Sequence, residues 1–133
     1  MSRREEVEYL FERSRRFYES SSILAEKGFY DLAVFCLEQS LQLYLKAALL
    51  ELGIDYPRSH SIRKLLEIIY KITLKEEVKE ILSRFAVELG ALEDAYITSR
   101  YVPREYTREE FEKLRRTVDE VLKIVGGAAG RRS

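Results

Sequence analysis

The stretch from Leu32 to Gly53, LAVFCLEQSLQLYLKAALLELG, most constrains what this chain can fold into. It contains no Pro, Asp, Asn or His, and before Gly53 its only charged residues are Glu38, Lys46 and Glu51. Such a sequence predicts a helix that is apolar around most of its circumference. A helix of this kind either lies at the centre of a bundle or buries its outer faces against a second chain.

A second long helix is predicted upstream of this stretch. Apolar residues recur there at spacings of three and four, which indicates an amphipathic helix. Ser2 and Glu5 have capping-box spacing at its start, and Gly28 is suited to a left-handed cap at its end. The next helix, expected over about 29–52, follows so closely that the two must form an antiparallel hairpin.

The rest of the chain predicts three more helices. Pro57 marks a loop, after which we expect a short third helix capped by Ser59 or Ser61. A long fourth helix should end before Pro103, and a fifth should begin at Thr107. The predicted fold is therefore an all-α, antiparallel up-and-down bundle of about five helices. We expect one domain over residues 1–125 and a flexible tail, GGAAGRRS, over 126–133.

The composition narrows the classes of partner. Lys plus Arg and Asp plus Glu each number 23, so the formal net charge is zero, and we expect neither DNA nor a membrane as a partner. A single Cys excludes an internal disulfide, and the chain has no signal-like or membrane-spanning apolar run, which together predict a cytoplasmic protein. The absence of Asn and the abundance of Glu, Lys and Arg favour a thermophilic source.

Few residues are available for catalysis. His60 is the only histidine, and it stands between Ser59 and Ser61 at the expected start of a helix. It either acts as an acid/base or phosphate-contacting group, or only caps and packs the loop. One His, one Cys and no Glu-x-x-His motif leave no ligand set for a metal, and no glycine-rich phosphate loop is present. We therefore expect neither a metal nor another cofactor.

The segment EDAYITSRYVPREYTREEFEKLRR interleaves arginines with tyrosines. Guanidinium groups and aromatic rings together suit a nucleotide or an RNA strand. Acidic residues in the same segment cancel its charge, however, and Tyr96 and Tyr101 are also suited to sealing the end of the core. Arg100 is the favoured single ligand-binding candidate, because it closes the fourth predicted helix immediately before the Tyr-Val-Pro corner.

Taken in order, these segments resemble the HEPN domain family over about residues 3 to 125. The resemblance is carried by GFYDLAVFCLEQSLQLYLKAAL, by SHSIRKLL and by SRYVPREYTREE. Members typically have Gly-x-Tyr-Asp-x-Ala before a Gln- and Lys-rich stretch, a His before Leu-Leu, and a Ser/Ala-Arg-Tyr-Pro corner. The matching positions are Gly28, Tyr30, Asp31, Ala33, Gln39, Lys46, Ala47, His60, Leu65, Leu66, Ser99, Arg100 and Tyr101. Glu38, Gln42 and Leu43 depart from the pattern and put in doubt a polar site shared with the family on that face.

The resemblance implies a function that the composition alone does not. Ribonuclease members carry an Arg followed four to six residues later by a His in the last helices, and this chain has no His after position 60. We therefore do not expect RNA cleavage by the family mechanism and assign no catalytic residue. In the alternative, a divergent ribonuclease toxin, the catalytic residues would be His60 and Arg100. The nucleotide- or ligand-binding candidates are Lys46, His60, Arg100 and Tyr101.

The resemblance also implies partners. Small stand-alone members look like companions of minimal nucleotidyltransferases in toxin–antitoxin or nucleotide-handling pairs. We therefore expect a non-catalytic interaction module that forms a homodimer, binds a small nucleotidyltransferase and takes a nucleotide, with RNA a less favoured ligand. On this interpretation, the spare apolar faces of the 32–53 helix bury against a second copy or a partner chain.

Overall fold

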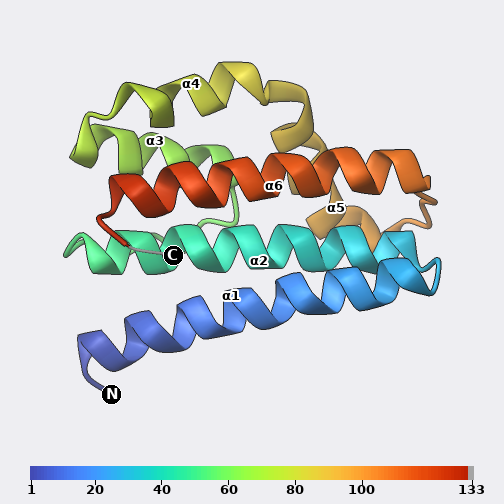
Figure 1. Cartoon of the computed structure of the whole chain (residues 1–133), viewed down its shortest axis with the longest axis horizontal. Helices are drawn as coiled ribbons and strands as arrows, with labels where there is room; N and C mark the ends of the chain where they lie inside the picture. Colours follow the sequence, from blue (N-terminus) through green and yellow to red (C-terminus); the bar gives the residue numbers. More distant parts are fainter. Residues whose placement is uncertain (132–133) are drawn as a thin grey trace.

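The structure, a computed structural model, describes residues 1–131 except the side chain of Ser99, and it is an all-α bundle in that range (Figure 1). None of its helices combines the length and the apolar character that crossing a membrane requires. The helices are α1 (Arg3–Glu26), α2 (Tyr30–Glu51), α3 (Ile62–Thr73), α4 (Glu76–Arg84), α5 (Ala86–Tyr101) and α6 (Arg108–Ala128).

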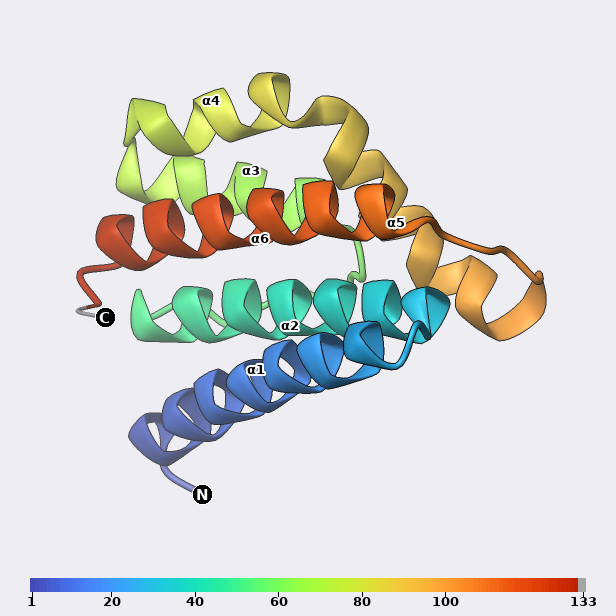
Figure 2. The same ribbon diagram turned by 45° about the vertical axis from the view of Figure 1, so that its right-hand side comes forward.

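Helix α2 is the centre of the bundle. It packs against α1 on one side and against α3, α5 and α6 on the others (Figures 1 and 2). Leu37, Leu41, Leu45 and Leu49, spaced four residues apart, are fully buried in the main core. Most of the apolar surface of α2 is thus covered by other helices of the same chain. Of the two alternatives for this stretch, the structure therefore matches a helix at the centre of a bundle. Leu32, at the start of the helix, remains 46% exposed.

The α1–α2 hairpin forms as predicted. Gly28 adopts a left-handed conformation with φ of 79°, which a residue with a Cβ adopts only with strain. The amide of Phe29 then donates to the carbonyl of Leu24 at 2.9 Å and closes the end of α1. Further along the hairpin, Ser14 Oγ donates to the Ser40 carbonyl at 2.6 Å and Ser40 Oγ to the Ser14 carbonyl at 2.8 Å. Each buried hydroxyl thus has a hydrogen-bond acceptor on the other helix, where the two helices lie close together.

The predicted capping box at Ser2 is confirmed, and a second capping box forms at Thr107, the predicted start of the last helix. At the start of α1, Ser2 Oγ accepts from the amide of Glu5, whose carboxylate accepts from the amide of Ser2. Thr107 and Glu110 make the same reciprocal pair at the start of α6. Ser61, one of the two serines proposed to cap the third helix, is the N-cap of α3. These local signals fix three helix starts because they satisfy amides that the helix itself leaves free.

The prediction of one long fourth helix is wrong, because the chain bends at Phe85 and forms two helices. Phe85 has φ of −112° and ψ of 27°, outside helical values. Helix α4 packs on α3 and α6, whereas α5 turns back to pack chiefly on α2 (Figure 2). A single straight helix cannot reach both surfaces. The apolar stripe continues through the bend, which is why the sequence pattern alone did not locate it.

The last helix extends beyond the domain end expected at residue 125. It runs through Gly126 and Gly127 to Ala128, and Gly130, with φ of 76°, ends it. Arg131 then lies over the ring of Phe11, with its guanidinium carbon 3.6 Å from the ring centre, and pairs with Glu8 at 3.3 Å. The part of the expected tail up to residue 131 therefore includes contacts with α1, and residues 132–133 lie outside the described residues.

Candidate functional site

A row of polar side chains interrupts the otherwise apolar surface of α2. Glu38, Gln42 and Lys46 are spaced four residues apart and so share one face of the helix. Gln42 Nε2 donates to Glu38 Oε2 at 2.7 Å, and Lys46 Nζ donates to Gln42 Oε1 at 3.0 Å. Gln39 Nε2 donates to the other Glu38 oxygen at 2.7 Å. Both oxygens of a carboxylate that is fully buried are thereby hydrogen-bonded.

Burial dominates the electrostatics of this row. It raises the pKa of Glu38 to about 7, against the opposing effects of the amides of Gln39 and Gln42 and the charge of Lys46. Burial also lowers the pKa of Lys46, and the charge of Glu38 acts in the other direction. No ion pair joins Glu38 to a basic residue among residues 1–131, so its carboxylate depends on amide donors. Such a group is close to neutralisation at physiological pH.

The loop before α3 brings His60 to this row. Its Nδ1 lies 3.0 Å from Gln42 Oε1, the same oxygen that accepts from Lys46. The imidazole stacks on the ring of Tyr96 from α5, with ring centres 4.7 Å apart and planes inclined by 21°. Partial burial and the positive charges of Lys46 and Arg100 lower the pKa of His60. The imidazole is therefore held on two sides and favours its neutral form.

Arg100 approaches the same tyrosine from the end of α5. Its guanidinium carbon lies 4.4 Å from the centre of the Tyr96 ring and 5.9 Å from that of Phe35 on α2. Its Nη1 donates to the Tyr96 hydroxyl at 3.3 Å. His60 and Arg100 thus both contact Tyr96, although 40 residues separate them in the sequence. We call Lys46, His60, Tyr96 and Arg100 the His60 cluster.

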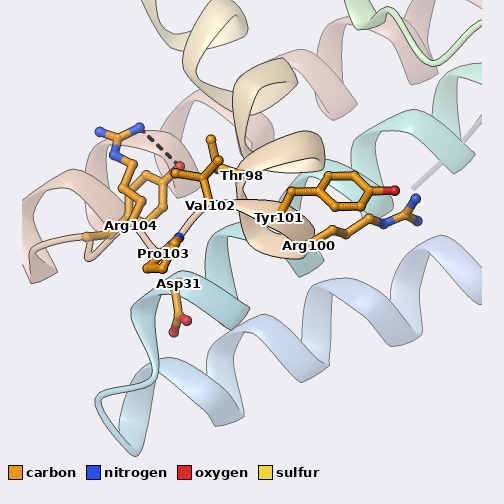
Figure 3. A pocket seen from close by; sticks show the side chains of 8 residues that line it. Asp31, Thr98, Arg100, Tyr101, Val102, Pro103 and Arg104 are labelled. Atoms are coloured by element: carbon orange, nitrogen blue, oxygen red, sulfur yellow. Dashed lines mark hydrogen bonds between the residues drawn. The ribbon is translucent and has the colours of Figure 1, made fainter.

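Tyr101 does not join these contacts. It is 75% exposed and lines a small pocket of about 240 Å³ at the α5–α6 corner, together with Asp31, Arg104 and Arg100 itself (Figure 3). Arg104 is held there by its own contacts, since it donates to the Tyr106 hydroxyl at 3.1 Å and pairs with Glu110 at 3.2 Å. In Figure 3 the side chains of Arg100 and Tyr101 extend away from Asp31 and Arg104.

The N-terminus of α3, beside His60, already carries an anion from the chain itself. The carboxylate of Glu93 on α5 accepts from Ser61 Oγ at 2.8 Å and from the amide of Arg63 at 3.0 Å. The Arg63 guanidinium donates to its other oxygen at 2.7 Å. Although burial opposes it, this set of donors lowers the pKa of Glu93. Because Glu93 already occupies this helix end, a phosphate bound near His60 would have to be held by cationic side chains.

Of the four sequence-predicted ligand-binding residues, the structure brings together Lys46, His60 and Arg100 and leaves Tyr101 at the rim. Glu38, Gln42 and Tyr96 also belong to the site, although they were not among the ligand-binding residues predicted from the sequence. The spacing of Glu38, Gln42 and Lys46 was a usable signal, because polar residues recurring every four positions in an apolar helix must share a face. Among the described residues, no cluster of His, Cys, Asp or Glu is arranged to hold a metal ion.

Comparisons with known proteins agree on one family. The model of the HEPN domain matches residues 7–128 of the chain. The fold is also similar to a crystal structure of an archaeal HEPN homologue, with a TM-score of 0.70 and 26% sequence identity. That alignment covers 92% of this chain and 97% of the homologue. No curated protein matches the sequence.

The buried carboxylate of Glu38 should make the stability of the protein depend on pH. The folded-state pKa of Glu38, about 7, lies above its ordinary value of 4.5, so its contribution to stability is present below pH 4.5 and lost as pH rises through 7. We expect Glu38→Gln to remove this loss, so that the stability of the variant relative to wild type increases by about 2 kcal/mol from pH 5 to pH 8. Urea unfolding of both proteins from pH 5 to pH 8 measures the difference.

The control is Glu67→Gln, which removes a carboxylate that is exposed on α3. Its unfolding free energy should follow that of wild type across the same range. The quantity of interest is the difference in unfolding free energy between each variant and wild type at each pH. A Glu38→Gln curve parallel to the wild-type curve would contradict the prediction.

Proposed function

Since the chain belongs to the HEPN domain family, we propose that it is a non-catalytic binding module that holds a nucleotide phosphate between Lys46 and Arg100, beside His60. One observation carries this proposal: within residues 1–131, these two cations have no carboxylate partner. None of the ion pairs among residues 1–131 includes Lys46 or Arg100. Unpaired cations that share a cluster favour an anionic ligand.

Aromatic rings beside the cations support a nucleotide rather than a bare anion. Lys46 Nζ lies 5.5 Å from the centre of the Tyr56 ring, and Arg100 lies against Tyr96 and Phe35. Phe35 and Tyr56 are both partly exposed, so each offers apolar surface at the edge of the cluster. Base–aromatic stacking beside phosphate-binding cations is the usual arrangement for nucleotides bound without sequence preference.

We expect Lys46→Ala and Arg100→Ala each to weaken the binding of adenosine 3′-monophosphate by about tenfold, because each removes one charge-assisted contact to the phosphate. Isothermal titration calorimetry at low ionic strength measures the affinity. The matched control is Arg84→Ala: Arg84 also stacks on a ring, 4.7 Å from the centre of Phe85, but it is the last residue of α4, whereas Arg100 lies near the far end of α5. Affinity unchanged in both cluster variants would remove the site assignment.

We also propose that the module forms a homodimer and binds a small nucleotidyltransferase, as the family resemblance implies. The dimer surface we propose is the apolar edge beside Arg100, where Leu32, Ile97 and Tyr101 are 46%, 56% and 75% exposed. A two-fold dimer requires one patch to complement itself, so any charged residues at its edge should be of both signs. Asp31 and Arg104, which line the adjacent pocket, supply them.

The test uses one tagged protein and two variants. Light scattering of the wild type should give twice the chain mass of 15.7 kDa, and a pull-down from the source organism should recover a small nucleotidyltransferase in near-equal amount. Ile97→Glu should yield monomers, because it places a charge within the apolar edge. Val87→Glu, at a site that is 81% exposed at the other end of α5, should remain dimeric. A monomeric wild type would contradict the dimer, and recovery of no transferase would contradict the partner.

A divergent ribonuclease is the second candidate, favoured by the shared contact of His60 and Arg100 with Tyr96. An imidazole and a guanidinium on one ring lie close enough to act on a single phosphodiester. This candidate predicts cleavage of RNA by the wild-type protein and its loss in His60→Ala, both measured on a broad panel of RNA substrates. An inert wild-type protein would dispose of it and leave the binding function untouched.

A further inference from the structure

We propose that Gln42, itself held by Glu38, fixes His60 in a single tautomer whose Nε2 accepts a hydrogen bond from a hydroxyl next to the bound phosphate. Gln42 and Glu38 are positioning residues in this arrangement, and His60 is a specificity residue. The ligand would be a phosphate ester with a free vicinal hydroxyl, such as a ribonucleotide. The part of this inference that concerns the ligand rests on the proposed nucleotide-binding function.

The contacts of Gln42 determine which way its amide faces. Its nitrogen donates to Glu38 Oε2 at 2.7 Å, and its oxygen lies 3.0 Å from Lys46 Nζ. An ammonium group only donates, and an ionised carboxylate only accepts. Both neighbours therefore require the same orientation, and the requirement from Lys46 persists when Glu38 is protonated.

The orientation of Gln42 determines the tautomer of His60. The Gln42 oxygen is the atom 3.0 Å from His60 Nδ1, so Nδ1 must carry the proton that forms this hydrogen bond. A neutral imidazole with a proton on Nδ1 has none on Nε2. Nε2 is thus an acceptor, and the Tyr96 ring stacked on the imidazole holds it in one plane. Without Gln42, nothing in these contacts selects one tautomer.

His60 presents this acceptor to solvent. The residue is exposed, and none of the hydrogen bonds among the described side chains of residues 1–131 uses Nε2. Lys46 shares the Gln42 oxygen with His60, and Arg100 shares the Tyr96 ring with it, so a phosphate held by both cations would lie close to the imidazole. Because Lys46 and His60 share the Gln42 oxygen, the ligand group that reaches Nε2 must be near that phosphate. A hydroxyl on the adjacent sugar carbon fits this requirement and can donate to Nε2.

The chain contains a single histidine, which makes the tautomer directly measurable. In protein prepared without a histidine tag, long-range ¹H–¹⁵N NMR spectra report one imidazole and distinguish its two nitrogens. We expect the Nδ1–H form in the wild type at pH 8 and its loss in Gln42→Leu, which removes the amide and leaves a side chain of similar size. The matched control is Gln39→Leu: Gln39 makes the same 2.7 Å bond to Glu38 without contacting His60, and this variant should keep the wild-type pattern.

Binding of a matched ligand pair tests the role of the acceptor. The wild type should prefer adenosine 3′-monophosphate over its 2′-deoxy counterpart by about fivefold, the worth of one partly exposed hydrogen bond. Gln42→Leu should lose this preference while still binding both ligands, and Gln39→Leu should retain it. Circular dichroism and thermal unfolding establish that each variant is folded.

The outcomes separate the inference from the proposed function. An Nε2–H imidazole in the wild type, or an unchanged tautomer in Gln42→Leu, would overturn the positioning role. Equal affinity of the wild type for the two ligands would overturn the hydroxyl assignment. Absence of binding of both ligands would overturn the nucleotide-binding function, together with the ligand assignment, while the NMR spectra would still decide whether Gln42 positions His60.

Discussion

The burial of α2 against four other helices is the constraint from which the rest of this structure follows. The leucines that recur every four residues along α2 form much of the core, and α1, α3, α5 and α6 pack around this helix. Once α5 packs on α2, however, the polar row Glu38–Gln42–Lys46 is enclosed with it. Burying a carboxylate costs free energy unless donors surround it. The network of amides, Lys46 and His60 is the consequence of placing that row at the α2–α5 contact.

Much of this fold was predictable from the sequence because its signals are local. The helix starts at Ser2, Ser61 and Thr107 are each determined by a side chain that bonds a free amide, and the left-handed Gly28 forces the hairpin. The bend at Phe85 was not predictable in this way. The bend is needed because α4 packs on α3 and α6 whereas α5 packs on α2. No local sequence pattern encodes where these two surfaces lie. Tertiary packing decides such breaks when the apolar period continues through them.

The site was predictable only in part, for a related reason. Lys46, His60 and Arg100 were identifiable by residue type and by family resemblance, but their mutual contact depends on Tyr96 and Gln42. Those two residues become part of the site only when α5 and the loop before α3 reach the same face of α2. Position 42 looked like a departure from the family pattern that weakened a polar site on this face. In the structure it is instead the residue that connects Lys46 to His60.

The chemistry of the cluster favours binding over catalysis. Cleavage of a phosphodiester requires one group to remove a proton and another to supply one. His60 is the one exposed side chain of the cluster that can accept a proton, and the guanidinium of Arg100 only donates hydrogen bonds. Glu38 titrates near 7 but is fully buried, and its two oxygens are occupied by Gln39 and Gln42. The cluster therefore offers one acceptor and two cations, a combination suited to recognising a phosphate with a neighbouring donor rather than to transferring protons on both sides of it.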